Sequence, residues 1–587
     1  MKKSITLLLL CLTVLGGCIT KSSSDGTLKT FLNLNFEEST AGSNIPIRWF
    51  LGEIGYKIQR FQDTETTHFM IKIMSNNPNN GDFGMVLNYI PINIVKGKTV
   101  LFKGKVKTEN VTNGYAGLWS GVNQSYGPLD FNNWNKRGIA NTTDWQLTSY
   151  EIFVDETANE FNFGLIFNGE GTAWFKDLEI YIDGEKYQDV KANELDRQET
   201  EWLSKSIYPL KSFNPREMSN EDLLVLNDLI GKSSVVALGE VTHGASEIFQ
   251  MKCRIIKYLI ENKNFNVFSL EANMPEAYKI NNYIIKQKGS PEDYLKGLYF
   301  WTWNTQEVLD FVEWMKEFNS LSERKIQFTG FDMQLFMGAI SVLQESFVNN
   351  KEESDLVNLL NSILENNMQK IMQSENPYTD EKNVAEIYEL THKLESRIKD
   401  SQTFTSQKEW LIQNLRIIEQ SVSCLDDDSK RDKYMADNFM WIKQQNPSSK
   451  FILWGHNAHI SKAEPWMGSQ LAKKLGSDYI NIGFAFYEGD YNAIGEKGLT
   501  SYPSQSAYLG TYEYYFNKVA DTPMFILDLR KVRQNNSDNC KWLKANLRFR
   551  TTGGMKITEE FNEVNVVDDY DIIIFINKVT PTKLLSK

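Results

Sequence analysis

An acid and a histidine stand between two glycines directly after a short apolar run, in the stretch Val235–Gly244. The pair is Glu240 and His243, and a helical pattern follows at once over Ala245–Glu261. This order predicts a strand, a tight loop and a helix, and open α/β sheets carry their chemistry at such a strand end beside a helix N-terminus. The two side chains are therefore held close together, so that one can act as acid or base while the other orients it.

Three of the five histidines follow predicted strands. His456 and His459 come directly after the apolar run 451–454, which places them at the carboxyl end of a second strand. They could therefore face the first histidine across a cleft. Structural or surface roles suit the other two, which are His68 in a β-rich region and His392 in a predicted helix.

Glu271 ends another apolar run, Val267–Leu270. A carboxylate at that depth is costly unless it is paired, so Glu271 is either hydrogen-bonded structure or part of a site. Its position at a strand end favours the site. The candidate catalytic set is then two acids and three imidazoles, namely Glu240, His243, Glu271, His456 and His459.

Two reactions can use these groups. In the first, a carboxylate-paired His243 removes a proton from water, and the water attacks an ester carbonyl with no covalent enzyme intermediate. No Gly-x-Ser-x-Gly stretch is present, so water is favoured over serine as the nucleophile. In the second, the imidazoles and carboxylates bind zinc, manganese or iron, although no His-Glu-x-x-His pattern accompanies the pair His456 and His459. The residue types leave both reactions open.

The elements that must position these residues alternate between strand-like and helical patterns over residues 201–587. Apolar strands separated by helices predict an α/β domain whose largely parallel sheet is covered on both faces. A helical insertion at about 352–445 is expected to wall a cleft. The expected strands are 265–270, 326–331, 450–454, 479–486, 524–529 and 572–576, besides the run from Val235.

The region 27–184 shows alternation of period two with frequent turn signals and no helical stretches, which predicts an all-β sandwich of the jelly-roll kind. Its closing run, Gly171–Tyr181, is similar to the last strand of carbohydrate-binding-module sandwiches. Trp119, Trp134 and Trp145 could stack on sugar rings, or they could be core or edge residues. A polar linker at 185–200 follows.

The N-terminus combines a basic start, a short apolar core and small residues before Cys18. It resembles a bacterial lipoprotein signal, with residues 1–17 removed, Cys18 lipidated and residues 18–26 as a tether. This predicts an anchored protein of the bacterial cell envelope. An ordinary secretory signal with an incidental cysteine is the alternative.

Composition narrows the choice of class. The chain has 587 residues, enough for two or three domains, and 41% are hydrophobic, so packed cores rather than disorder are expected. A net charge of −12 argues against nucleic acid as a partner. The cysteines beyond the signal region, at 253, 424 and 540, are widely spaced and suggest neither a disulfide framework nor a zinc motif.

Six motifs together resemble the signature of the erythromycin esterase family, from about Gln198 to the C-terminus. They are Gly239–Gly244, Val267–Ala272, Trp301–Trp303 before Glu307, Phe328–Gln334, Arg431–Asp432 with Met435 and Asn438, and Trp454–His459. The resemblance implies hydrolysis of a carboxylic ester or macrolide lactone without metal or other cofactor. It also implies that His243 is the base and that the other four members of the catalytic set are its partners.

The resemblance carries one departure. Nine residues after the motif histidine, where some members have arginine, this chain has Lys252, with Arg254 nearby. Either side chain could neutralise an acid or contact substrate, but lysine cannot replace arginine in a bidentate role. Trp301 and Trp303 could line a cleft for a large ring or belong to the core. The motif pair Arg431 and Asp432 is interpreted as a structural ion pair.

Two alternatives come from other classes. The α/β half also resembles a haem- or iron-binding lipoprotein family, in which the histidine pair 456 and 459 would hold the ligand. The protein could instead be a non-catalytic, glycan-binding surface protein in which the sandwich carries the function. An envelope location suggests an acylated glycan as one native ester substrate.

Overall fold

The computed structural model describes residues 31–585, apart from residues 40–44, 53–54, 64–67, 79–81, 125–126, 132–137, 159, 188–191, 373–380, 403, 427, 520–521 and 558. The predicted signal peptide and tether, with Cys18, lie outside the described residues, as does Trp134. Within the described part of the chain, no helix combines the length and the apolar character needed to cross a membrane.

The N-terminal region, residues 31–187, is strand-rich, as predicted, and is called the β-domain below. Its long strands β5 and β8 pair along most of their length, and β8 pairs with β4 by its first half and with β3 by its second. The elements are β1 (Phe50–Gly52), β2 (Tyr56–Gln62), β3 (Phe69–Ser75), β4 (Gly84–Tyr89), α1 (Ile92–Val95), β5 (Thr99–Gln124), β6 (Gly127–Phe131), β7 (Ile139–Phe153), β8 (Glu160–Ile182) and β9 (Glu185–Lys186).

Alternation along these strands fills one apolar core. Trp49, Phe102 and Phe163 meet edge to face in its centre. Trp119 belongs to this core and is 6% exposed, so it has no ring face for a sugar. Trp145 is partly exposed, and the Lys176 ammonium lies 4.4 Å from its ring centroid. Likeness of the β-domain to carbohydrate-binding sandwiches stays a prediction.

The second domain is built on a mixed sheet with the strand order β10-β17-β20-β15-β11-β14-β12-β13. The expected parallel pairing holds from β20 to β13, whereas β17 and β10 pair antiparallel at one edge and β16 pairs antiparallel with β15. The strands are β10 (Ile207–Pro209), β11 (Val235–Leu238), β12 (Val267–Asn273), β13 (Gln327–Asp332), β14 (Phe451–Trp454), β15 (Tyr479–Gly495), β16 (Gly498–Pro503), β17 (Met524–Asp528) and β20 (Ile572–Val579).

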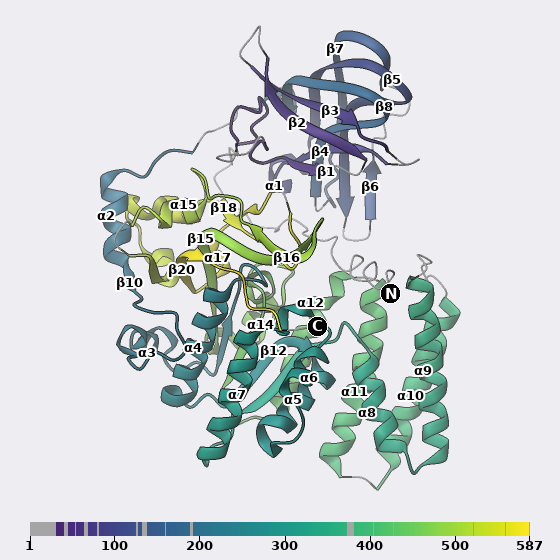
Figure 1. Ribbon diagram of the computed structural model, residues 1–587, viewed down its shortest axis with the longest axis vertical. Helices are drawn as coiled ribbons and strands as arrows, with labels where there is room; N and C mark the ends of the chain where they lie inside the picture. The colour runs from purple at the N-terminus through teal and green to yellow at the C-terminus, as the bar shows by residue number, and fades with distance from the viewer. Residues whose placement is uncertain are drawn as a thin grey trace.

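Helices cover both faces of this sheet (Figure 1). The principal helices are α2 (Arg197–Ser206), α3 (Leu226–Ile230), α4 (Ser246–Lys263), α5 (Met274–Lys286), α6 (Pro291–Lys296), α7 (Gln306–Leu321), α12 (Arg431–Gln445), α13 (Asn457–Ile460), α14 (Met467–Leu475), α15 (Tyr512–Phe516), α16 (Leu529–Gln534) and α17 (Val566–Asp569). A separate two-stranded hairpin is formed by β18 (Leu547–Arg550) and β19 (Phe561–Val564).

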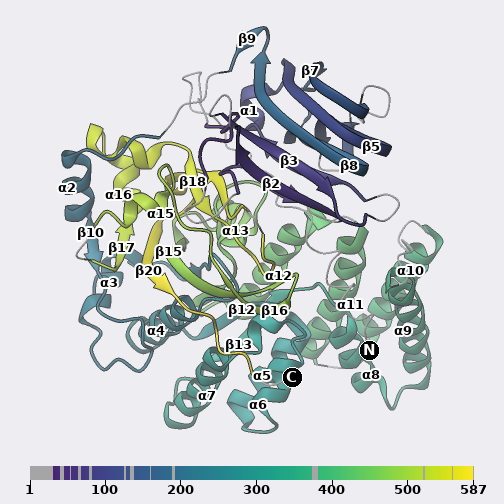
Figure 2. The same cartoon turned by 45° about the horizontal axis from the view of Figure 1, so that its top comes forward.

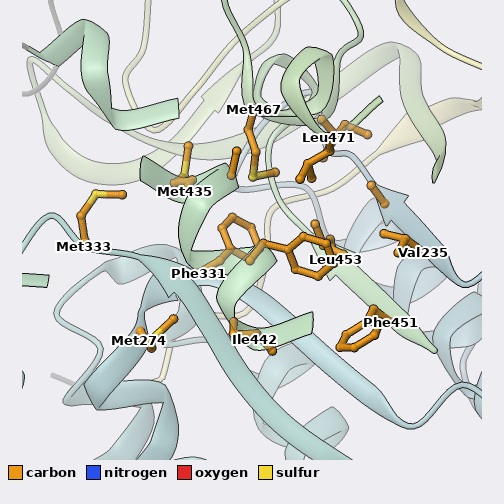
Figure 3. Close-up of a cluster of buried hydrophobic side chains, with 14 of the residues drawn as sticks. Val235, Met274, Phe331, Met333, Met435, Ile442, Phe451, Leu453, Met467 and Leu471 are labelled. Carbon is orange, nitrogen blue, oxygen red and sulfur yellow. The ribbon is translucent and has the colours of Figure 1, made fainter. Parts of the chain in front are cut away.

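Strands buried on both faces explain the continuous apolar runs in the sequence. In β11, Val236 and Leu238 pack with α4, α5 and α7, whereas Val235 and Ala237 pack in the opposite core. Figure 3 shows part of that opposite core, where Met435 and Ile442 of α12 and Met467 of α14 meet the strand residues. The sheet therefore has two cores, and its strand ends are left for polar loops.

The predicted helical insertion is present. Helices α8 (Met337–Phe347), α9 (Lys351–Met372), α10 (Glu381–Asp400) and α11 (Thr405–Asp426) pack on one another beside the sheet (Figures 1 and 2). The last predicted insertion helix, α12, instead packs against β13 and α14. The insertion thus returns the chain to the sheet with the first residues of α12 at the carboxyl end of the strands.

Gly244, at the end of the loop after β11, has no room for a side chain. A Cβ there would lie 2.0 Å from the Asn492 carbonyl oxygen, and backbone atoms cannot shift cheaply. We predict that Gly244→Ala lowers the free energy of unfolding by more than about 2 kcal/mol, measured by urea unfolding. Gly553→Ala is the control, since nothing lies within 4 Å of that Cβ. Equal destabilisation by the two substitutions would contradict the prediction.

Candidate active site

The loop after β11 forms a carboxylate–imidazole pair. Glu240 is fully buried, and its Oε1 lies 3.2 Å from Nδ1 of His243. When the imidazole is neutral, its Nδ1–H donates to the carboxylate and the lone pair stays on Nε2. The His243 side chain is 19% exposed, and among the described residues Nε2 has no hydrogen-bond partner. This nitrogen can therefore meet a bound water or substrate.

Lys252 of α4 lies beneath this pair. Its ammonium donates to Oε2 of Glu240 and, at 3.4 Å, to the Gly455 carbonyl, and it lies 4.3 Å from the centroid of the Trp454 ring. Burial lowers the pKa of Lys252 to about 8, although the nearby carboxylate of Glu240 opposes this shift. Lys252 has no exposed surface. It therefore supports Glu240 from inside the protein and does not reach the cleft, where the sequence had suggested a substrate contact.

A second charged group is built on Glu271, the residue that β12 delivers to the same edge of the sheet. Its Oε1 accepts from Nη2 of Arg431 at 2.9 Å and lies 3.3 Å from Nε2 of His459. On the other side of the His459 ring, Nδ1 lies 2.9 Å from Oδ1 of Asp432. Arg431 also donates to both oxygens of Asp332 at the end of β13, at 3.2 and 2.8 Å.

The charges in this group are mutually dependent. Burial and the adjacent Arg431 lower the pKa of His459, but the carboxylates of Asp432 and Glu271 outweigh them and raise it to about 10. Burial disfavours ionisation of Glu271, yet the positive charges of His459 and Arg431 hold the pKa of its carboxyl well below the usual range. The two carboxylates therefore favour the protonated form of His459, in opposition to the Arg431 guanidinium, whose Nη1 lies 3.1 Å from Nε2.

His456 lies between the two groups, with its ring centroid 5.2 Å from that of His243. Its Nε2–H donates to the Thr552 carbonyl at 2.9 Å, and its Nδ1 accepts the Ala458 N–H at 3.3 Å. Because a carbonyl can only accept, these contacts select the Nε2–H tautomer. Burial, followed by the neighbouring histidines, lowers the pKa of His456 to about 3. His456 is thus a neutral imidazole with both nitrogens in use.

Trp301 and Trp303, which the sequence assigned either to a cleft or to the core, take different positions. Trp303 is 2% exposed and donates from Nε1 to the Glu271 carbonyl at 3.1 Å, so it forms the floor of the site. Trp301 is partly exposed and lies beside Gly554, whose Cβ position would be 3.6 Å from both Trp301 and His243. Trp301 therefore borders the site, and its contact with substrate stays a prediction, whereas Trp303 belongs to the core.

Arg254 lies away from this group of residues. Its guanidinium forms a buried pair with Asp222 at 2.6 Å and donates to the carbonyls of Ser212 and Ser219. These contacts tie α4 to the segment before α3. The structure therefore gives Arg254 a packing position, and the expectation that it contacts substrate has no support from its location.

Sequence reasoning missed two residues of the site, Asp332 and Thr552, and misread one pair. Arg431 and Asp432 do not pair with each other: Arg431 joins Glu271 and Asp332, while Asp432 holds His459. Asp332 ends an apolar strand just as Glu271 does, and that signal could have identified it. No signal of this kind marks Thr552, which reaches the site on a loop about 100 residues beyond the last motif.

The arrangement of the histidines and carboxylates bears on the alternative that they bind a metal ion. Among the described residues, no group of three or more His, Cys, Asp or Glu side chains is arranged to hold a metal ion. Both ring nitrogens of His456 face protein backbone, and the Arg431 guanidinium lies 3.1 Å from Nε2 of His459. A cation in that position would meet an existing positive charge.

Residues 260–579 match the sequence model of the erythromycin esterase family. This range is more than half of the chain. The chain belongs to the erythromycin esterase family. In this family member the loop Gly239–Gly244 precedes the matched range, whereas Glu271, Arg431 and the His456–His459 motif lie within it.

Relatives and a solved structure extend this likeness. The protein YbfO of Bacillus subtilis (strain 168) is 26% identical over 434 residues, which cover 66% of this chain and 92% of YbfO. Erythromycin esterase type II of Escherichia coli is 25% identical over 341 residues, or 51% of this chain and 80% of that enzyme. A solved succinoglycan biosynthesis protein is 27% identical with a TM-score of 0.56, covering 66% of this chain and 98% of its own.

The pKa of His459 makes stability depend on pH. The folded value of about 10 exceeds the ordinary 6.5, so the stabilisation is fully present below about pH 6.5 and is lost as pH rises towards 10. We predict that the wild type loses more free energy of unfolding between about pH 7 and about pH 9.5 than His459→Gln does, by up to about 1.4 kcal/mol per pH unit. Urea unfolding at both pH values measures this. Parallel losses in the two proteins would be evidence against a cationic His459.

Proposed function

We propose that this chain hydrolyses a carboxylic ester or lactone with a water molecule activated by His243. The observation that carries the proposal is the pairing of partly exposed His243 with buried Glu240 at the carboxyl end of β11, which leaves Nε2 without a hydrogen-bond partner among the described residues. Family membership supports a hydrolase. The alternatives of a ligand-holding histidine pair or a non-catalytic protein receive no comparable support.

In the proposed reaction, Nε2 of His243 accepts a proton from water while the water oxygen bonds to the carbonyl carbon. The carbonyl π electrons move to its oxygen and give a tetrahedral oxyanion. When that oxyanion collapses, the C–O bond to the leaving group breaks, and the His243 imidazolium returns its proton to the departing alkoxide. The products are a carboxylic acid and an alcohol, or one hydroxy acid from a lactone. Glu240 stabilises the transient imidazolium, and Lys252 fixes Glu240 in place.

The second charged group supplies the electrostatic part of this proposal. His459 and Arg431 are cations on the edge of the sheet that carries His243, with side chains 12% and 17% exposed. Preformed positive charges facing a developing oxyanion lower the barrier, typically by about 3 kcal/mol for one well-placed donor. Their carboxylate partners keep them oriented before substrate arrives. His456, a neutral imidazole, lies between the Glu240–His243 pair and the charged group built on Glu271.

We propose that this reaction needs no metal or other cofactor. Besides water, the chemistry above uses one imidazole base and fixed positive charges, and His243, Arg431 and His459 can supply these groups. The cationic guanidinium inside the histidine–carboxylate group supports this choice.

The substrate proposal is an ester on a large molecule. One relative is named an erythromycin esterase and one solved neighbour a succinoglycan biosynthesis protein, which supports macrolide lactones and acylated glycans as the two classes to test. Trp301 at the rim offers an apolar face to either. Glycan binding by the β-domain would suit the second class.

We predict that the protein incubated with erythromycin gives a product heavier by one water, that chelator does not prevent this, and that His243→Asn lowers turnover by about 1,000-fold or more because the base is lost. Mass spectrometry measures the product. His392→Asn is the matched control, since that histidine is exposed in the insertion.

Retained turnover in folded His243→Asn would contradict the assignment of the base, and loss of turnover on chelation would contradict the metal-free mechanism. Acylated glycans of the envelope are the second substrate panel. No hydrolysis of either panel by the wild type would contradict the proposed function.

We also propose that the mature protein is anchored to the cell envelope through a lipid on Cys18. The support is the signal-like sequence that precedes this cysteine. We predict that Cys18→Ser in a bacterial host prevents lipidation, so that metabolic labelling with a fatty acid is lost and the protein leaves the membrane fraction. Cys11→Ser, inside the predicted signal, is the control. Unchanged labelling of Cys18→Ser would contradict the proposal.

A further inference from the structure

The loop between β18 and β19 forms the roof of the candidate site. Its Thr552 carbonyl accepts from His456, and Gly554 lies against His243 and Trp301. The loop is held from below, because the Thr552 N–H and hydroxyl both donate to the Val241 carbonyl, at 3.1 and 2.9 Å. It therefore contacts both His456 and His243.

The β-domain contacts this hairpin at Glu559, just before β19, and at Glu563 within β19. The backbone N–H of Arg48 donates to Oε2 of Glu559 at 2.8 Å, and its guanidinium lies 3.7 Å from Oε2 of Glu563. The Glu563 N–H donates to the Tyr89 hydroxyl at 3.3 Å, while the Tyr89 ring lies under the guanidinium at 4.9 Å. Figures 1 and 2 show the β-domain resting on this part of the second domain.

The Arg48 contact is built into the interior. Its side chain is 1% exposed, which is costly for a charged group unless it is paired, and the acid beside its guanidinium is Glu563 at 3.7 Å. The backbone of Arg48 has a φ of 78°, a conformation that non-glycine residues rarely adopt and that surrounding contacts must enforce. An incidental domain contact would not require a buried arginine in this conformation.

A short path joins Arg48 to the catalytic histidines. Glu559 lies two residues before β19, at the end of the roof loop, and it also faces the Arg548 guanidinium of β18 at 3.8 Å. Both strands of the hairpin are thus fixed next to the β-domain. Movement of these strands would shift the Thr552 carbonyl, and with it the tautomer and position of His456.

We propose that Arg48 of the β-domain is a positioning residue for the active-site roof, so that the β-domain is part of the catalytic unit rather than a spacer. The proposal rests on the proposed esterase function, because the aligned groups are those of its mechanism. Arg48 touches no reacting group and acts on the hairpin through its guanidinium, which lies 3.7 Å from Glu563 and over the Tyr89 ring, whereas its backbone N–H donates to Glu559 whatever the side chain. Displacements of about 1 Å at catalytic groups cost up to about 100-fold in rate.

The test compares Arg48→Met with Lys176→Met in the full chain. Both substitutions remove a cation of the β-domain that pairs with an acid, but Lys176 pairs with Asp63 inside the β-domain at 2.9 Å, and among the described residues none of its hydrogen bonds or ion pairs reaches the hairpin. We expect Arg48→Met to lower kcat for erythromycin about 10- to 100-fold with a smaller change in KM, and Lys176→Met to leave both unchanged.

A second readout does not depend on turnover. With five histidines in the chain, the His456 Nε2–H proton can be assigned by NMR, and its hydrogen bond to Thr552 should protect it from exchange with solvent. We expect that protection in the wild type and in Lys176→Met, and its loss in Arg48→Met. If erythromycin is not hydrolysed by any variant, this measurement still decides the proposal separately from the esterase function.

Arg48→Met with wild-type kcat and a protected His456 proton would overturn the proposal. If Arg48→Met does not fold, Tyr89→Phe takes its place, because it removes only the hydroxyl that accepts the Glu563 N–H. It should shift kcat and His456 exchange in the same direction by a smaller factor. No shift in either quantity in folded Tyr89→Phe would likewise count against the proposal.

Discussion

The buried carboxylate of Glu240 is the constraint on which the site depends. Its two oxygens hold two different partners, the imidazole of His243 and the ammonium of Lys252. Burying an unpaired charge costs several kcal/mol, so the strand end, the first turns of α4 and the loop beyond must all keep these partners in place. The same pairing that makes burial tolerable also fixes the tautomer and direction of His243, the proposed base. Stability and chemistry share one interaction here.

A second constraint acts across the sheet. Strands β11, β14 and β12 are neighbours and parallel, so their carboxyl ends bring Glu240, His456 and Glu271 to one edge. The two histidines that follow β14 then differ in the charge that their surroundings favour. The carboxylates on either side of His459 favour its protonated form, whereas burial and the two neighbouring imidazoles favour the neutral form of His456. One edge of the sheet thereby offers a base, a neutral spacer and fixed cations within one site.

The sequence could predict what strand order and local pattern determine. Apolar runs precede Glu240, Glu271 and His456, and these runs predicted neighbouring strands of one sheet. Because residues at the carboxyl ends of parallel strands lie close together, they also predicted that the candidate catalytic residues would meet. The antiparallel edge formed by β10 and β17 carries no pattern that distinguishes it from a parallel strand, so the sheet was expected to be more parallel than it is. The spacing of Lys252 from the motif histidine marked it as a candidate, but its burial against Glu240 could not be predicted. Burial of a lysine depends on the partner that it meets in the folded protein.

The position of the roof loop over the site could not be predicted from the sequence. Thr552 and Gly554 belong to no motif, and their role arises only because the hairpin folds back over strands encoded 300 residues earlier. The residues that fix this hairpin come from still farther away, in the β-domain. A backbone carbonyl has no sequence signature, yet it selects the tautomer of His456 as firmly as a side chain would. The parts of this site contributed by backbone and by a neighbouring domain are therefore the parts that only the three-dimensional arrangement can reveal.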